Sequence, residues 1–130
     1  MNNTISIEDL TNGSLESICK LATICDHTFL KRPESYLEQT RIKGQNAIDI
    51  CSEELNKFLM KTKSFIENRI IPYSLCIRPE YITRVMSWLN FNVPKINNPH
   101  IASVVGFPGV DYPIQLTLAE TEYVIDNGAD

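Results

Sequence analysis

Residues 101–130 follow one order: an apolar strand, a Gly/Pro turn, an amphipathic helix and a glycine stop. Residues 101–105 are apolar and rich in β-branched side chains, which is typical of a buried strand in a parallel sheet. Residues 106–109 break this run, and Gly128 stands where a left-handed residue ends a helix. The helix positions expected on or beside one face are Ile114, Leu118, Ala119, Val124 and Ile125. We therefore predict a βα unit, with Ala129 and Asp130 entering a further strand.

Two earlier segments repeat this order of strand and helix. We expect strands at about residues 22–28 and 73–77. Pro33 suits a first helical turn, Gly44 marks a break before a long helix, and Pro79 opens the helix after the second strand. The apolar stripes expected to face inward are Ala47, Ile48, Cys51, Leu55, Phe58 and Leu59 in the long helix, and Ile82, Val85, Met86 and Leu89 in the next one.

The region before the first strand is predicted to hold one short helix. Residues 1–13 are polar and are expected to be a frayed lead-in. Ser14 is a suitable cap for a helix through Lys20, with Leu15, Ile18 and Cys19 facing inward. We accordingly treat 1–20 as an N-terminal extension and 21–130 as three βα units of one domain.

Strand alternation places polar side chains together. In an extended first strand, Asp26 and Thr28 share one face, while Cys25 and His27 share the other. In the second strand, Ser74, Cys76 and Arg78 share one face, opposite Leu75 and Ile77. A carboxylate beside a hydroxyl in a buried strand is costly unless another group satisfies it or a reaction uses it.

Three successive strand–helix units imply parallel strands joined by crossovers. An open doubly wound sheet and a closed (β/α)8 barrel both satisfy this order, and both place chemistry at the carboxyl ends of the strands. A barrel needs about 250 residues, and this chain has 130. The residues that we expect at these carboxyl ends are Asp26, Thr28, Cys76, Arg78 and the turn at Gly106–Pro108.

Composition limits the classes of function. The net charge of −4 gives no reason to expect nucleic-acid or membrane binding, and no apolar run is long enough to span a bilayer. No basic segment followed by an apolar core opens the sequence, so we expect a cytoplasmic protein. The four cysteines lack a paired CxxC spacing and are expected to be reduced packing residues.

Four motifs in order resemble those of the deoxyribose-phosphate aldolases. Residues 25–31, C-D-H-T-F-L-K, resemble the family's D-H-T-L-L-K opening, and residues 75–79, L-C-I-R-P, are similar to its second-strand pattern. Residues 101–108 match its V-x-V-I-G-F-P strand. Residues 118–121 and 126–130 look like its next helix and its N-G-A-D-E-I-D approach to the fourth strand. The resemblance covers about residues 24–130.

The resemblance implies an α/β fold, a partial (β/α)8 TIM barrel comprising about the first three βα units. It implies a class I aldolase that reversibly cleaves 2-deoxy-D-ribose 5-phosphate into acetaldehyde and D-glyceraldehyde 3-phosphate, a step of deoxyribonucleotide catabolism. Such enzymes use a lysine Schiff base and no metal or other cofactor. The family's proton relay carries over to Asp26 and Thr28, and its substrate-proximal cysteine to Cys76.

Several family features have no counterpart in this sequence. The Schiff-base lysine, its activating lysine and the phosphate loops belong to the sixth to eighth strands, so the 130-residue chain alone is expected to be inactive. The relay aspartate of the fourth strand is also missing, and Lys31 matches a loop lysine. Residues 109–113 depart from the family's continuation after G-F-P, and the first crossover is longer than in compact bacterial members.

Other reactive residues have simpler interpretations. His27 is expected to be a satisfied structural histidine, and His100 to be solvated in a Pro/Asn-rich loop. Trp88 and Phe107 are expected to be core residues. The sequence lacks the four-ligand spacing of a metal site. Cys76 is expected to be a substrate-proximal or packing thiol.

Three hypotheses remain open from the sequence. The first is the amino-terminal part of an aldolase whose partners are a small sugar phosphate and either the remainder of the barrel or a second copy in a homodimer. The second is a non-catalytic fragment or interaction module that associates with another chain, because three parallel strands leave open edges and an uncovered face. The third is an unrelated open α/β binding domain, which strands that reverse their order around a crevice would favour.

Overall fold

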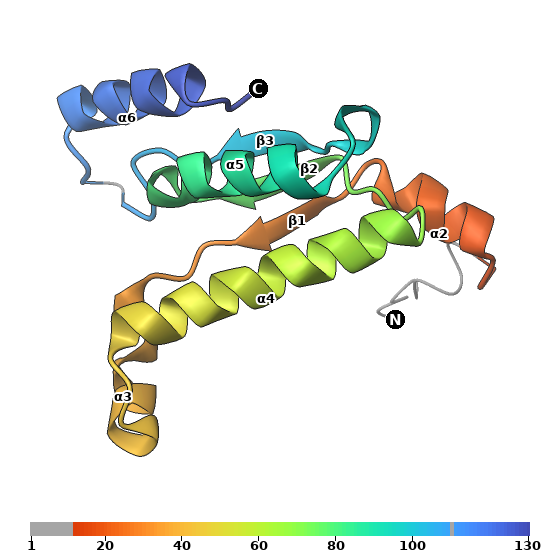
Figure 1. Ribbon diagram of the computed structural model, residues 1–130. Coiled ribbons are helices and arrows are strands. Elements are labelled where there is room, and N and C mark those ends of the chain that lie inside the picture. Colours follow the sequence, from red (N-terminus) through yellow and green to blue (C-terminus); the bar gives the residue numbers. More distant parts are fainter. Residues whose placement is uncertain (1–11, 110) are drawn as a thin grey trace, which may run out of the picture.

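The computed structural model describes residues 12–109 and 111–130. Most of the lead-in expected at residues 1–13, and Val110 of the altered turn, lie outside the described residues. Helices and strands alternate along the chain (Figure 1). The elements are α2 Leu15–Ala22, β1 Asp26–Phe29, η1 Pro33–Tyr36, α3 Leu37–Lys43, α4 Ala47–Glu67, β2 Ser74–Ile77, η2 Pro79–Tyr81, α5 Ile82–Asn92, η3 Lys95–Asn97, β3 His100–Ser103 and α6 Ile114–Asp126.

The three strands form one parallel sheet in the order β1-β2-β3. Asp26 lies opposite Ser74, and Ser74 lies opposite His100, so the strands begin at one level. The strand order follows the chain and does not reverse, as it would at the switch point of a doubly wound sheet. The structure therefore has the architecture of a partial TIM barrel, as the sequence predicted.

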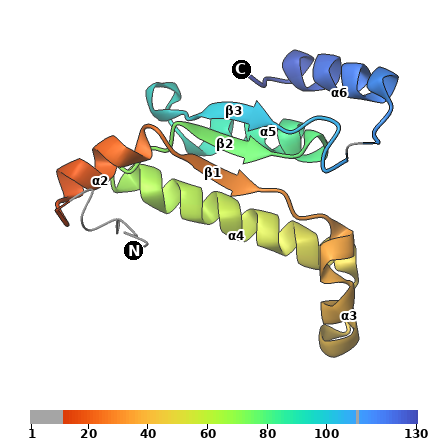
Figure 2. The ribbon, with the colours of Figure 1, turned by 180° about the vertical axis from the view of Figure 1, so that it is seen from behind.

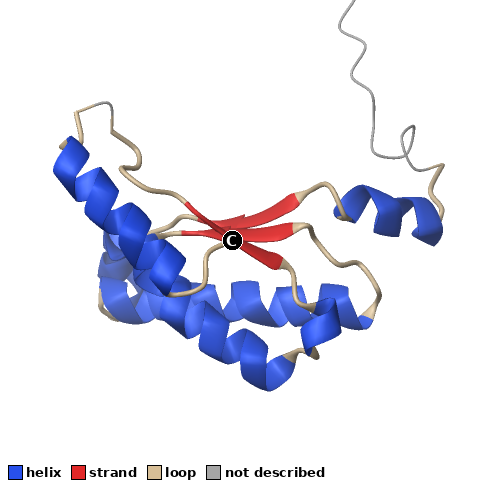
Figure 3. Cartoon of the chain, turned by 90° about the horizontal axis from the view of Figure 1, so that it is seen from above, coloured by secondary structure: helices blue, strands red, loops and turns tan. Residues whose placement is uncertain are grey.

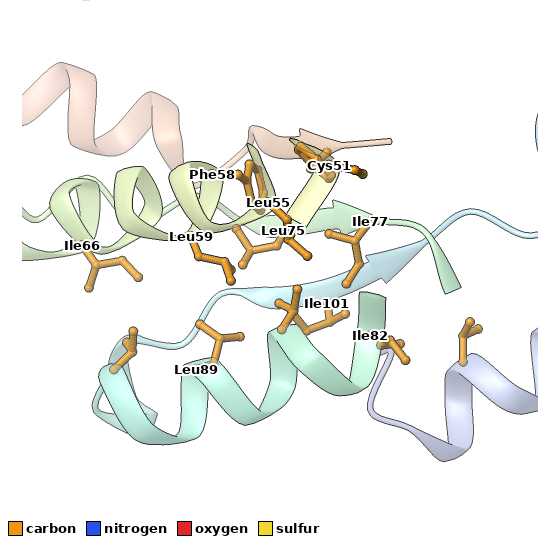
Figure 4. Close-up of a cluster of buried hydrophobic side chains, with 14 of the residues drawn as sticks. Cys51, Leu55, Phe58, Leu59, Ile66, Leu75, Ile77, Ile82, Leu89 and Ile101 are labelled. Atoms are coloured by element: carbon orange, nitrogen blue, oxygen red, sulfur yellow. The ribbon is translucent and has the colours of Figure 1, made fainter. Parts of the chain in front are cut away.

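Helices cover one face of the sheet. Figure 3 shows the strands with the main helices gathered on one side, and Figure 2 shows the sheet from the uncovered side. The core lies between the covered face and helices α4 and α5, as the close-up in Figure 4 shows. Its most buried side chains are Ile50, Leu55, Leu59, Leu75, Ile77, Ile82, Val85 and Leu89. Leu75 and Ile77, the strand residues of this set, alternate along β2 with residues of the open face.

Helix α4 is the main cover of β1 and β2. Gly44, with a φ of 67°, ends α3, and the Asn46 side chain then accepts a hydrogen bond from the Asp49 amide, 2.8 Å away, which caps α4. The expected break at Gly44 is confirmed. The expected stripe is wrong at one position, because Ile48 is 69% exposed and Ile50 is buried in its place.

The first and last helices are less buried than the sequence predicted. Ser14 caps α2 as expected, but Leu15 is exposed and no residue of α2 is fully buried. In α6 only Val124 is buried. The predicted inward face, with Ile114, Leu118 and Ile125, is exposed. Amphipathic periodicity identified both helices, but the described residues supply no layer that covers these apolar side chains.

Two strand boundaries differ from expectation. Residues 23–25 form hydrogen-bonded turns after α2, so β1 begins at Asp26. The third strand begins one residue early, at His100, and ends at Ser103. At the far end of the chain the Asp130 amide donates to the Ile101 carbonyl, 2.9 Å away, which continues the pairing beyond β3. Across the described residues, no helix has both the length and the apolar character that crossing a bilayer requires.

Candidate functional site

The open face of the sheet carries a compact set of polar side chains. Asp26 lies in register with Ser74, and Thr28 with Cys76. The Ser74 hydroxyl donates a hydrogen bond of 2.5 Å to Oδ1 of Asp26. Ser74 is buried, although it belongs to the open face, while Asp26 is exposed. Asp26 and Thr28 share one face of β1, as expected, and the parallel register places Cys76 on the same face of the sheet. The expectation that Asp26 lies at the carboxyl end of its strand is wrong, because Asp26 is the first residue of β1.

The environment of Cys76 keeps its sulfur as a thiol. Partial burial, and secondarily the nearby carboxylate of Asp26, raise the pKa of the Cys76 thiol. A raised pKa lowers the fraction of thiolate, which is the nucleophilic form of cysteine. Cys76 is thus suited to lie beside a ligand without attacking it.

A second polar group surrounds the amino-terminal ends of the strands. His100 Nδ1 lies 2.5 Å from Oδ2 of Asp130, and the His100 ring lies 4.8 Å from the Tyr73 ring. These residues line a cavity of about 370 Å³ together with Asp26 and Ser74. The prediction that His100 lies in a loop is wrong, since it is the first residue of β3. Its side chain is exposed, as expected, and it pairs with Asp130.

The opposite, carboxyl-terminal edge carries two arginines and a glutamate. Arg78 follows β2 and donates through Nε to Glu80 Oε1, 2.9 Å away. Arg32, in the loop after β1, places Nε 3.4 Å from the same oxygen. The Arg78 guanidinium also lies 5.6 Å from the centre of the Phe107 ring. Phe107 is 41% exposed, so the expectation of a core residue at this position is wrong. Trp88 is partly buried against the core.

Lys31 and Thr28 line an open groove beside this edge, of about 590 Å³. The Lys31 amine lies 6.0 Å from the centre of the Tyr36 ring. The Lys31 carbonyl accepts a hydrogen bond of 2.8 Å from the Tyr81 hydroxyl. Lys31 is therefore a loop residue, as the resemblance implied, and its backbone carbonyl joins the first crossover to Tyr81 of η2.

His27 lies on the covered face and takes no part in the open-face group. Its ring stacks on Phe58 with 4.3 Å between centroids and meets Phe65 edge-on. Burial, and secondarily the charge of Lys61, lower the pKa of His27. The prediction of a structural histidine is confirmed by this packing, but its buried Nε2 has no hydrogen-bond partner among the described residues. The His27 ring is therefore well packed, but its hydrogen-bonding capacity is only partly used.

The described part of the chain has no cluster of side chains suited to a metal ion. Residues 12–109 and 111–130 contain no group of three or more His, Cys, Asp or Glu side chains that could hold a metal ion. The four cysteines are free thiols, and Cys51 contacts the Tyr81 hydroxyl at 3.2 Å inside the core.

Comparisons with known proteins address the fold. No protein-family model and no curated protein sequence matches the chain. A solved structure described as a "putative deoxyribose-phosphate aldolase" from Coccidioides immitis matches with a TM-score of 0.56 and 19% identity. This chain has an aldolase-like fold. The match covers 86% of this chain and 34% of the other, so the chain spans about a third of the length of that structure.

The likeness confirms the predicted fold class and extends over most of the described chain. At 19% identity it concerns the backbone arrangement, and the roles of Asp26, Thr28 and Cys76 remain predictions from the motifs. The backbone places these three residues on the uncovered face of the first two strands.

Sequence reasoning missed Ser74 in the open-face group and the pair of His100 and Asp130 in the second polar group. Ser74 was placed on the correct face but not in the site, although its position in register with Asp26 follows from parallel pairing. His100 and Asp130 were not recognised as a pair, because they are thirty residues apart in the chain. The position of Asp130 could have been inferred from the sequence. It is predicted to open a further parallel strand beside β3, and neighbouring parallel strands begin at the same edge of the sheet.

Proposed function

We propose that this chain contributes the first part of the active site of a deoxyribose-phosphate aldolase. The reaction would be the reversible cleavage of 2-deoxy-D-ribose 5-phosphate into acetaldehyde and D-glyceraldehyde 3-phosphate through a lysine Schiff base, within deoxyribonucleotide catabolism in the cytoplasm. The observation that carries the proposal is the shared open face of Asp26, Thr28 and Cys76, in register across β1 and β2. An aldolase-like backbone around that face supports it.

Each side chain has a chemical task in this proposal. The Asp26 carboxylate transfers a proton, since a carboxylate is a suitable general acid–base when it is held in place. Ser74 supplies that restraint through its 2.5 Å hydrogen bond to Oδ1, which leaves Oδ2 available. Thr28 extends the hydrogen-bond path along the strand, and Cys76 borders the substrate as a neutral thiol. The strands of the described sheet contain no lysine, so the Schiff-base amine must come from elsewhere.

Borohydride trapping tests the assignment of the nucleophile. The purified chain is mixed with 2-deoxyribose 5-phosphate and sodium borohydride, and the product is analysed by intact-mass spectrometry. We expect no stoichiometric adduct, because the described strands contain no lysine. Lys31, which lines a groove with Thr28, is a loop residue whose amine lies 6.0 Å from the centre of the Tyr36 ring. A stoichiometric adduct on one lysine of the isolated chain would contradict the proposal that the amine lies outside this chain.

A chimaera tests the roles of the open-face residues. Residues 21–130 replace the corresponding three βα units of an active deoxyribose-phosphate aldolase, and aldehyde release is measured. We expect cleavage by the chimaera and a loss of about 100-fold in kcat for Asp26→Asn, because positioned proton transfer contributes about 10²–10⁴-fold. Asp126→Asn, on the exposed surface of α6, is the matched control and should keep the activity. Equal activity of the two variants would refute the role of Asp26.

A non-catalytic interaction module is the second candidate. The exposed apolar side chains of α6, above all Ile114, Leu118 and Ile125, favour this alternative because such a surface is usually covered by another protein layer. Light scattering on the purified chain distinguishes the candidates when it is combined with the chimaera. A stable self-associated or partner-bound chain, together with an inactive but folded chimaera, would favour the interaction module.

A further inference from the structure

Arg78 is a buried charged residue at the carboxyl end of β2. Its side chain is only 5% exposed, and burying a guanidinium is costly unless it is paired and hydrogen-bonded. Its one hydrogen bond to a described side chain runs from Nε to Glu80, a residue whose own side chain is 41% exposed. Nη1 and Nη2, which carry four further N–H donors, have no acceptor among the described residues.

A second arginine shares the same carboxylate. Arg32 places Nε 3.4 Å from Glu80 Oε1, the oxygen that also accepts from Arg78. Two guanidinium groups therefore meet one carboxylate, which leaves one unit of positive charge in this cluster. Arg32 comes from the loop after β1 and Arg78 from the end of β2, so both cations lie on the edge where α/β folds bind ligands.

The turn after β3 forms the remaining wall of this cluster. The Phe107 ring lies 5.6 Å from the Arg78 guanidinium, and Tyr112 follows it in the same turn. Glu120 of α6 accepts hydrogen bonds from the Gly106 amide and the Tyr112 hydroxyl of this turn. Glu120 thus orders the turn and forms no ion pair with either arginine.

We propose that Arg32 and Arg78 form a binding site for a phosphate monoester at the carboxyl edge of β1 and β2. The planar guanidinium fork matches phosphate oxygens in a bidentate manner, and an aromatic face beside Arg78 restricts its orientation. The chain's net charge of −4 disfavours an extended polyanion, so a small ligand fits the site. This site is separate from the phosphate loops that the aldolase resemblance places on later strands, and it holds whether or not the proposed reaction is correct.

Inorganic phosphate is the probe for this site. The full 130-residue chain is titrated with phosphate at constant ionic strength against chloride, and the arginine Nε–Hε signals are followed by NMR. We expect saturable shifts of the Arg32 and Arg78 signals. Arg32→Gln should weaken binding by about tenfold, since it removes one charge-assisted contact. Glu80→Gln should strengthen binding several-fold, because it removes the carboxylate that competes with phosphate.

Two comparisons separate binding from a structural role. Arg84→Gln, which removes an arginine bonded to Ser52 and Asn56 on the outer surface, should leave phosphate binding unchanged. Arg32 is 46% exposed, so its variant is expected to fold even if Arg78→Gln does not. The proposal fails if the shifts do not saturate, if chloride reproduces them, or if Glu80→Gln and Arg32→Gln bind phosphate like the parent chain.

Discussion

The Ser74 hydroxyl donates a 2.5 Å hydrogen bond to Oδ1 of Asp26, across the boundary between β1 and β2. The two residues are forty-eight positions apart in the chain and are brought into register by parallel pairing. The bond joins a buried hydroxyl to an exposed carboxylate, so it fixes the orientation of the group on the open face that is the best candidate for proton transfer.

Ser74→Ala should lower the free energy of unfolding by about 1 kcal/mol, the usual net value of one hydrogen bond. The loss is moderate because water can solvate the exposed Asp26 carboxylate once the hydroxyl is gone. Urea denaturation followed by circular dichroism measures the change. Ser87→Ala, at an exposed position of α5, is the control and should stay within about 0.5 kcal/mol of the parent.

Cys76 should react slowly with iodoacetamide at pH 8. Partial burial, and secondarily Asp26, raise the pKa of its thiol, so little thiolate is present. Cys25 is exposed and should be alkylated first, as peptide mass spectrometry with time can show. Asp26→Asn should speed the alkylation of Cys76 selectively, because it removes the negative charge that disfavours the thiolate. Unchanged kinetics at Cys76 in that variant would contradict the assignment.

Stability should fall in mild acid because of His27. Burial, and secondarily Lys61, lower the folded-state pKa of His27 below its ordinary value of 6.5. The unfolded chain therefore binds the proton more readily, so the stabilisation is present above pH 6.5 and is lost as the pH falls from 6.5 through the lower folded-state pKa. Urea midpoints measured from pH 7.5 to pH 5 test this expectation.

The variant His27→Phe keeps a flat ring against Phe58 and removes the titrating group. In a His100→Asn background, in which the second histidine is absent, the acid-dependent decline should persist with His27 and disappear with His27→Phe. A decline of equal size in both chains would show that another group is responsible.

The covered and uncovered sides of α4 should respond differently to truncation. Leu55→Ala removes a side chain with 0% exposure and should cost about 2–5 kcal/mol, through lost burial and the cavity that remains. Ile48→Ala removes a side chain that is 69% exposed and should change the stability by less than about 0.5 kcal/mol. Thermal unfolding of the two variants measures the difference. Similar losses in both would mean that α4 is rotated about its axis.

The sequence was sufficient to assign residues to the two faces of each strand, because side-chain alternation follows directly from an extended backbone. Asp26 and Thr28 were assigned to one face of the first strand, and Ser74 and Cys76 to one face of the second. The structure added that parallel pairing puts these two faces on the same side of the sheet. The order of the elements also followed from local patterns, since each helix has its own stripe, cap or glycine stop. The choice of an aldolase-like fold came from the resemblance of four motifs, because the patterns alone left two architectures open.

Contacts that depend on packing could not be predicted from periodicity. Ile48 and Ile50 both lie in the apolar pattern of α4, and only the sheet decides which of them is buried. The apolar face of α6 was identified correctly as apolar, but the described residues leave it exposed. The pairing of His100 with Asp130 depends on where the chain returns beside β3, which no local pattern specifies.

The one-sided placement of helices α4 and α5 divides the substitutions of this chain into two classes. Alterations of Leu75 or Ile77 disturb contacts with the helices and should register mainly in melting temperature. Cys76 lies between them along β2 and pairs with Thr28 of β1. Alterations of Cys76 or Thr28 lie on the other side of the sheet and should register mainly in ligand recognition. A saturation scan of β1 and β2 would therefore show two alternating kinds of phenotype, with a period of two residues.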